Sequence, residues 1–112
     1  MKKDLKVYVD DMLDAILSIE RYVGTMDEAT FSGKDYMQDA VMRQLAIIGE
    51  AARQVPEETR AMQPTIPWRK IIDFRNVIIH EYSGVSMGRV WRIIVNDLPY
   101  LKDQIVFLRQ KV

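Results

Sequence analysis

The chain has 112 residues, 48% hydrophobic and 29% charged, a length and composition typical of one soluble globular domain over residues 1–112. It has no cysteine and one histidine, which excludes disulfides and thiolate metal sites and predicts no zinc site and no other bound metal or cofactor. The net charge is zero, whereas nucleic-acid-binding domains usually carry a basic excess.

The charges are nevertheless unevenly distributed. Residues 1–50 hold six basic and ten acidic side chains, and residues 51–112 hold ten basic and six acidic ones. Solvated helix faces explain this pattern most simply, and an anion-binding face in the second half is the alternative. No apolar stretch approaches the roughly 20 residues of a membrane span, and acidic residues interrupt the N-terminal segment too early for a signal peptide. The lack of cysteine fits a cytoplasmic location.

The first predicted element is a helix over residues 5–23. Its apolar side chains recur at spacings of four and three, which places them on one stripe: Leu5, Val9, Met12, Ile16, Ile19 and Val23. Gly24 and the polar segment over residues 25–32 are expected to end this helix.

A second long helix is predicted to begin at Ser32–Asp35, which has the form of a capping box. It is expected to end near Val55, because Pro56 disfavours helical geometry at the residue before it. Small side chains in its second half indicate close approach to another helix: Gly49, Ala51 and Ala52.

The second half of the chain contains a short helical turn over residues 56–62 and two further long helices. Pro67 suits the first position of a helix that starts at Trp68 and ends near Gly84. The last segment spans residues 88–111, where Pro99 either kinks one helix or starts a second after Asp97. No segment shows the alternation of a half-buried strand, so the predicted fold class is all-α. We expect four long helices in an antiparallel up-and-down bundle, with an additional short helix.

The single histidine, His80, belongs to a polar group in the third long helix. Asn76 is four residues before it, so the two share a helix face and Asn76 is placed to support the imidazole. Arg75 and Tyr82 are seven apart and also share a face. Arg75 and His80 diverge by about 140° and about 7.5 Å along the axis of one straight helix. They can reach one substrate if the helix ends or bends before His80, or if a second copy of the helix faces the first across a two-fold axis.

These residue types suit cleavage of an RNA phosphodiester. Histidine exchanges a proton near neutral pH, and arginine binds phosphate through a planar, permanently charged group. In metal-independent cleavage the 2′-hydroxyl of RNA attacks the adjacent phosphate, His80 assists the proton transfers and Arg75 stabilises the developing negative charge. The spacing of arginine and histidine is not specific by itself. A histidine at a helix end, hydrogen-bonded to the backbone, is the alternative.

The pattern Arg75-Asn76-x-x-x-His80-x-Tyr82 resembles the R-x4-H-x-Y signature of HepT-like proteins in the HEPN superfamily. The stretches "AIIGEAAR", "IPWRKIIDFRN" and "VWRIIVNDLPYLKDQI" agree in order and spacing, so the resemblance covers nearly the whole chain. It implies a bundle of four to five helices, usually dimeric, with the motif in a cleft at the dimer interface. One departure is "DFRN", where many relatives have a Gly-Met type pair. Asp73 there is acidic and opposes phosphate binding.

The resemblance also implies a function. Such proteins are ribonuclease toxins, of a type II-like toxin–antitoxin system, and their partner is a MntA-like minimal nucleotidyltransferase that acts as antitoxin. Arg75 and His80 carry over as the catalytic pair, and Tyr82 as the residue to which the antitoxin attaches AMP. The expected partners are an RNA substrate (tRNA or mRNA), a second copy of the chain and the antitoxin, with higher hetero-oligomers of the two proteins and no membrane.

Alternatives remain for individual residues and for the whole protein. Tyr82 is either a modification site or an amphipathic core tyrosine with a solvated hydroxyl. For Glu50 a structural ion pair with an arginine is favoured over simple exposure. For Trp68 and Trp91 a place in the core or in an interface is favoured over a base-stacking surface. The chain as a whole is alternatively a non-catalytic helical binding module that docks and is modified by a nucleotidyltransferase, or a purely structural bundle.

Overall fold

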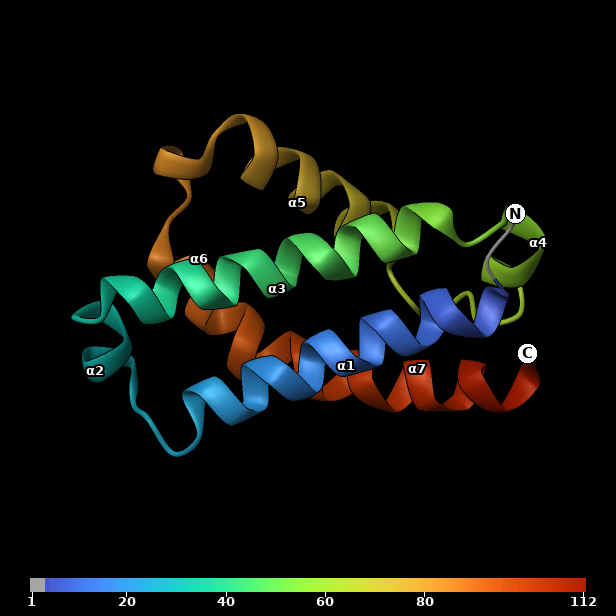
Figure 1. The fold of residues 1–112 in the computed structure, drawn as a ribbon, viewed down its shortest axis with the longest axis horizontal. Coiled ribbons are helices and arrows are strands. Elements are labelled where there is room, and N and C mark those ends of the chain that lie inside the picture. Colours follow the sequence, from blue (N-terminus) through green and yellow to red (C-terminus); the bar gives the residue numbers. More distant parts are fainter. Residues whose placement is uncertain (1–3) are drawn as a thin grey trace.

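The computed structural model describes residues 4–112, so residues 1–3 of the predicted domain and of its N-terminal segment lie outside it. Four long helical segments pack along one another: α1 (Leu5–Val23), α3 (Asp35–Gln54), α5 (Trp68–His80) and the run from α6 (Met87–Arg92) to α7 (Leu98–Lys111). No β-strand occurs between residues 4 and 112, which confirms the all-α class. Successive long segments run in opposite directions in Figure 1, in agreement with the predicted bundle.

Helix α1 has the predicted ends. The Asp4 carboxylate caps its first turn by accepting a 2.9 Å hydrogen bond from the amide of Lys6. Gly24 ends the helix with φ at 55°, a left-handed conformation that glycine adopts without strain. Five of the six side chains in the predicted stripe are buried: Val9, Met12, Ile16, Ile19 and Val23.

The predicted capping box at the start of α3 is wrong. Ser32 instead ends a short helix, α2 (Glu28–Ser32), and Lys34 precedes α3 without a capping side chain. The Gln38 side-chain amide donates to the carbonyl oxygens of Phe31 and Ser32, so a side chain inside α3 satisfies the end of α2. The other end agrees with the prediction, because α3 stops at Gln54 and the residue before Pro56 is extended.

Helix α5 is shorter than predicted. The turn α4 (Glu57–Arg60) lies where a short helical turn was expected, and Pro67 is the cap of α5 rather than its first residue. The helix ends at His80, four residues before the predicted end at Gly84. Glu81 has φ −137° and ψ 40°, which breaks the helical path, and a short 3-10 turn, η1 (Tyr82–Gly84), follows.

The last helical run combines both predicted effects of Pro99. Between α6 and α7 the backbone forms a π-helical segment, η2 (Ile93–Asp97), and α7 begins at Leu98 with Pro99 in its first turn. Proline has no amide hydrogen and its ring collides with the carbonyl of the preceding turn. A wider turn just before it accommodates both features without ending the run.

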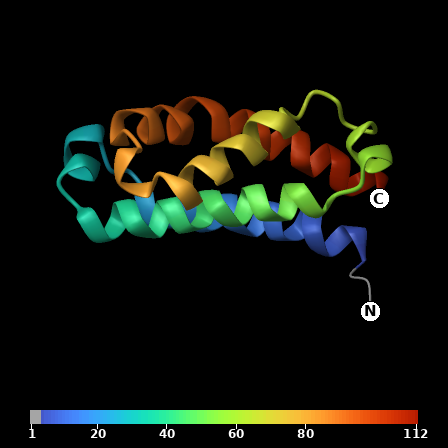
Figure 2. The same cartoon turned by 90° about the horizontal axis from the view of Figure 1, so that it is seen from above.

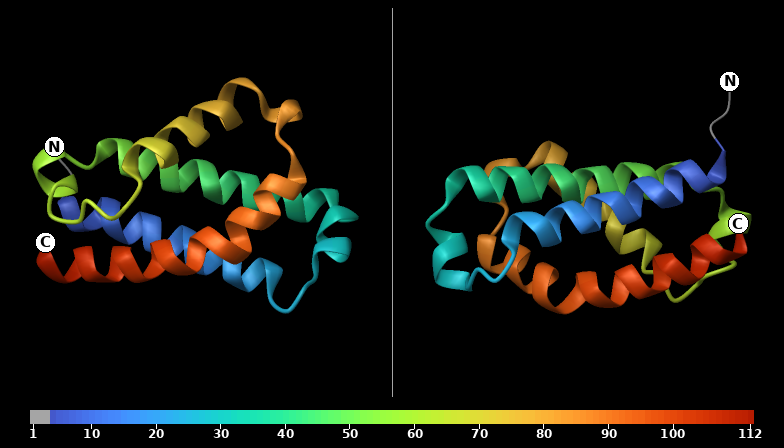
Figure 3. Two further views of the ribbon diagram at one scale, coloured as in Figure 1. Left: turned by 180° about the vertical axis from the view of Figure 1, so that it is seen from behind. Right: turned by 60° about the horizontal axis from the view of Figure 1, so that its bottom comes forward.

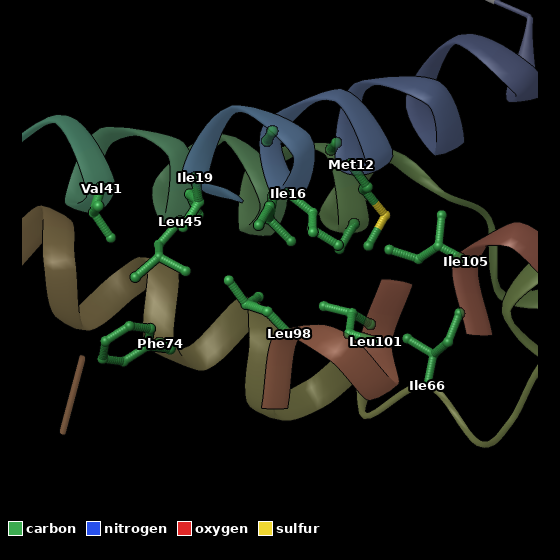
Figure 4. Close-up of a cluster of buried hydrophobic side chains, with 14 of the residues drawn as sticks. Met12, Ile16, Ile19, Val41, Leu45, Ile66, Phe74, Leu98, Leu101 and Ile105 are labelled. Carbon is green, nitrogen blue, oxygen red and sulfur yellow. The ribbon is translucent and has the colours of Figure 1, made fainter. Parts of the chain in front are cut away.

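The core lies between these helices. Helix α3 packs between α1 and α5, and α7 packs against α1 on the other side, as Figures 1 and 2 show. Buried side chains from all four segments meet in the centre, including Met12 from α1, Leu45 from α3, Phe74 from α5 and Leu101 from α7 (Figure 4). Helix α4 and the C-terminus lie at one end of the bundle, and the connection from α5 to α6 lies toward the other (Figure 3).

Candidate active site

Gly49 brings α5 against α3 at the position of Arg75. A Cβ atom added at Gly49 would overlap the Cβ of Arg75, and it would lie 2.9 Å from its Cγ and 3.1 Å from the carbonyl oxygen of Ile71. Only a residue without a side chain leaves room for this approach. The prediction of a close helix contact at the small residues of α3 is therefore confirmed, and the contact fixes where the Arg75 side chain begins.

The guanidinium of Arg75 is held by an ion pair. Its Nη2 lies 3.0 Å from the Oε2 of Glu50, and its Nη1 donates a 3.0 Å hydrogen bond to the Oδ1 of Asn76. The Arg75 side chain is 24% exposed, so its guanidinium is held by Glu50 on one side while part of it faces solvent. Glu50 thus forms the predicted structural ion pair. The amide of Asn76 contacts Arg75, one residue away, rather than His80.

Glu50 binds two arginines and an amide at once. Arg53 donates through Nε at 3.3 Å and through Nη2 at 3.0 Å, and the Gln54 amide donates at 3.2 Å. The hydrogen bonds from Arg53 are the main cause that lowers the pKa of Glu50, with the Gln54 amide and the charges of Arg53 and Arg75 acting in the same direction. The carboxylate therefore stays ionised and keeps Arg75 in place.

The lowered pKa of Glu50 predicts a loss of stability in acid. A carboxylate whose folded pKa lies below its usual value of 4.5 stabilises the fold above that pH, and the contribution disappears as pH falls through the lowered pKa. We therefore expect the difference in unfolding free energy between the wild type and Glu50→Gln to shrink below pH 4.5 in denaturant titrations. Arg53→Ala removes the largest cause and should return the pKa of Glu50 toward its usual value. A difference that is independent of pH would contradict this.

His80 is the last residue of α5 and is exposed. Within residues 4–112 its imidazole forms no hydrogen bond or ion pair with another side chain or with the backbone. The alternative of a helix-end histidine bonded to backbone therefore does not describe this side chain. The exposed imidazole is accessible to a ligand.

Tyr82 is attached to α3. Its hydroxyl donates a short hydrogen bond to the Oδ1 of Asp39, and its side chain is 45% exposed. Burial is the main cause that raises the pKa of Tyr82 to about 12, and the hydrogen bond and negative charge of Asp39 raise it further. Sequence reasoning missed this contact, because the two residues are 43 positions apart and Asp39 looks like any exposed acid on a helix.

Arg75 and Tyr82 do not share a helix face, which corrects the expectation from the sequence. That expectation assumed an unbroken helix to Gly84, whereas the helical path breaks at Glu81. The two side chains bind different points of α3, Glu50 and Asp39, whose positions are 11 residues apart, or about 16 Å along the helix axis. One chain therefore holds the predicted site residues as separate groups: Arg75 with Asn76, the exposed His80, and Tyr82 with Asp39.

The other residues singled out from the sequence have structural partners. Asp73 lies 3.8 Å from the Nε of Arg69 one turn away, so its charge is partly balanced by an exposed arginine. The Trp68 indole is buried and donates to the carbonyl of Gln63, and the Trp91 ring packs 5.3 Å from that of Phe31. Both tryptophans thus belong to the core, as predicted.

A groove of about 370 Å³ lies between α5 and the α6–α7 run, and Leu45 and Ile48 of α3 form its floor. Three cations line it: Lys70, Arg89 and Arg92. The Arg89 guanidinium lies 4.6 Å from the centre of the Phe74 ring, and none of the three forms an ion pair within residues 4–112. The basic character of the second half of the chain is thus partly concentrated here.

The described part of the chain holds neither a cluster of metal-binding side chains nor a membrane-spanning helix. No group of three or more histidine, cysteine, aspartate or glutamate side chains is arranged to bind a metal ion there. No helix between residues 4 and 112 is long and apolar enough to span a membrane.

Comparison with known proteins assigns the chain to a family. The family model described as Ribonuclease HepT-like matches residues 12–108. The chain belongs to the HepT-like ribonuclease family. This match includes the motif from Arg75 to Tyr82, the two acids that hold its side chains, and Gly49. No solved structure gave a significant match.

Curated proteins similar to this HepT-like chain include two from Methanocaldococcus jannaschii. One, named a gamma-glutamylcyclotransferase and candidate RNase, is 36% identical over 112 residues, which is 100% of this chain and 50% of that protein. The chain thus spans half the length of this relative. The other, named a candidate RNase, is 31% identical over 93% of this chain and 95% of its own length. A protein named probable ribonuclease HepT from Thermococcus cleftensis is 36% identical over 98% of this chain and 100% of its own.

Proposed function

We propose that this chain is the ribonuclease toxin of a toxin–antitoxin pair, and that it cleaves RNA with Arg75 and His80 and without a metal ion. Membership of the HepT-like ribonuclease family supports the activity. The observation that carries the assignment of residues is the Arg75 guanidinium, held by Glu50 and partly open to solvent, one and a half turns before the exposed imidazole of His80.

The chemistry requires only these two types of group. The 2′-oxygen of one nucleotide forms a bond to the adjacent phosphorus, and the bond from phosphorus to the 5′-oxygen of the next nucleotide breaks. His80 exchanges protons with the attacking or the leaving oxygen. Arg75 stabilises the additional negative charge on the phosphate oxygens in the transition state. The products are a 2′,3′-cyclic phosphate and a free 5′-hydroxyl.

We further propose that the active form is a homodimer. On one α5 helix Arg75 and His80 point about 140° apart, so a single chain presents them in different directions. Two α5 helices related by a two-fold axis can bring the Arg75 of one chain toward the His80 of the other. An exposed apolar side chain near the end of α5, Ile79, supports an interface there. The cations of the groove, including Arg89 and Arg92, support contact with RNA phosphates.

Regulation by a cognate nucleotidyltransferase completes the proposal. Tyr82 is a partly exposed side chain two residues after His80, and its hydroxyl is the proposed acceptor of AMP. A bulky anionic group there would compete with the substrate phosphate for the cations of the site. The toxin, its antitoxin and the RNA (tRNA or mRNA) would then all meet in the cytoplasm, in a hetero-oligomer of toxin and antitoxin.

The alternative is a binding module that is modified but has no activity, and the zero net charge favours it. Incubation of the purified chain with total tRNA and mRNA in the presence of EDTA separates the two. The ribonuclease should cut and leave 2′,3′-cyclic phosphate ends, and DNA of the same sequences should remain intact because it lacks the attacking hydroxyl. Loss of all cutting in EDTA would exclude the metal-independent mechanism. Absence of cutting under every condition would favour the binding module.

A further inference from the structure

The contact between Tyr82 and Asp39 is the one hydrogen bond that joins the turn after His80 to α3 within the described residues. The other hydrogen bonds of residues 81–85 are local, such as those from the Gly84 amide to the carbonyl of Glu81 and from the Val85 amide to that of Tyr82. Tyr82 is 45% exposed as a residue, so its side chain is held at the hydroxyl while part of it faces solvent. A carboxylate that touches an accessible hydroxyl is the arrangement used to activate that hydroxyl as a nucleophile.

We propose that Asp39 is the catalytic base for nucleotidyl transfer to Tyr82, because it holds the hydroxyl in position and accepts its proton during the reaction. This inference rests on the modification of Tyr82 proposed above. The Tyr82 oxygen forms a bond to the α-phosphorus of ATP, the bond from that phosphorus to the bridging oxygen of the β-phosphate breaks, and pyrophosphate leaves. The phenolic proton passes to the Oδ1 of Asp39 and from there to solvent.

The local environment makes a base necessary. The pKa of Tyr82 is raised to about 12, mainly by burial, so the phenolate is scarce at neutral pH. A neutral phenol is a weak nucleophile, and removal of its proton as the new bond forms restores reactivity. Asp39 is the only charged group that shifts this pKa within the described residues. Its neighbours one turn away on α3 are Asp35 and Arg43, both exposed, and neither forms a hydrogen bond to Tyr82 there.

The transfer would also break the contact. Once esterified, the Tyr82 oxygen carries no hydrogen and cannot donate to Asp39. The new phosphodiester is anionic and is repelled by the adjacent carboxylate. The modified tyrosine therefore leaves Asp39, and the turn after His80 loses the hydrogen bond that joins it to α3. Modification then changes the path of the chain next to His80 in addition to blocking the site.

The test is the rate of transfer to variants of Asp39. A minimal nucleotidyltransferase of the MntA-like class is supplied with ATP labelled at the α-phosphate, and incorporation of the label into this chain is followed across pH. Tyr82→Phe should accept no label. Asp39→Asn keeps an oxygen acceptor without the basic charge, and we expect its rate at neutral pH to fall by about 10²-fold or more and to recover as pH rises. Asp35→Asn is the matched control, one turn away, and should react like the wild type.

The possible outcomes distinguish a failure of the role of Asp39 from a failure of the modification of Tyr82. Equal rates and equal pH profiles for the wild type and Asp39→Asn would overturn the role of Asp39 and leave the modification intact. No label on the wild type would overturn the modification and, with it, the need for a base. The contact itself is checked without any partner by NMR of the chain with ¹³C-labelled tyrosine ring carbons. The pKa of Tyr82 should fall below about 12 in Asp39→Asn, with the part of the rise that burial causes remaining, and an unchanged pKa would contradict the contact.

Discussion

His80→Ala is expected to lower the rate of RNA cleavage by about 10²–10⁴-fold, the usual contribution of a positioned acid or base. Arg75→Ala should cost about 10²–10³-fold, because one cation that stabilises transition-state charge contributes about that much. His80 is exposed at a helix end and forms no hydrogen bond or ion pair within the described residues. The loss of activity in His80→Ala should therefore appear at unchanged stability of the fold. Rates are measured on a defined RNA oligonucleotide under single-turnover conditions, with thermal unfolding as a check of folding.

Arg69→Ala is the matched control for the arginine. It removes a 92% exposed arginine from the same helix and should leave the rate nearly unchanged. Equal losses in Arg69→Ala and Arg75→Ala would point to non-specific binding of RNA by positive charge. Full activity in His80→Ala would exclude the proposed mechanism.

Mixed dimers test whether the two catalytic groups come from different chains. An Arg75→Ala chain and a His80→Ala chain, co-expressed with different tags and purified as a heterodimer, retain one complete site if each site uses Arg75 of one chain and His80 of the other. About half of the wild-type rate is then expected, whereas each homodimeric variant is inactive. A heterodimer as inactive as its parents would place both groups of each site on one chain.

The sequence predicted the helices well because their signals are local. The stripe of α1 from Val9 to Val23, the end of α3 before Pro56 and the close approach at Gly49 each depend on residues within a few turns of one another. The choice of Arg75 and His80 as the catalytic pair also rests on a local signal, a short motif and its resemblance to a family, and it stays a prediction.

The contacts that the sequence did not predict are those between distant residues. Nothing at Glu81 or Tyr82 opposes a helix by propensity, so the pattern favoured continuation to Gly84. The chain instead leaves the helix at Glu81, and Tyr82 bonds to Asp39, 43 positions earlier. The false capping box has a similar origin, since Ser32 ends α2 and its carbonyl accepts a hydrogen bond from the Gln38 amide, while its side chain does not cap α3. Tertiary contacts thus decided both helix ends.

Gly49→Ala is expected to destabilise the fold by about 1–3 kcal/mol, although alanine is the better helix former. The added methyl would overlap the Cβ of Arg75 and approach the Ile71 carbonyl at 3.1 Å, and neither group can rotate away because both are anchored to the α5 backbone. Forcing an additional methyl into a packed contact typically costs about 1–3 kcal/mol. The gain in helix propensity is at most about 1 kcal/mol and does not offset a clash with backbone-anchored atoms.

Gly88→Ala provides the matched control, because Gly88 is also helical but has space. A Cβ there would meet only the Ser86 Oγ at 3.6 Å and the Arg92 Nη1 at 3.7 Å, which are ordinary contacts. We expect this variant to gain about 0.5–1 kcal/mol from helix propensity alone. Unfolding in urea should therefore shift in opposite directions for the two variants.

If Gly49→Ala were as stable as Gly88→Ala, α5 would be free to move away from α3, and the position of Arg75 over Glu50 would not be fixed by packing. If it is destabilised as expected, RNA cleavage should also fall in the folded fraction, because the same displacement moves the Arg75 guanidinium from its place beside Glu50.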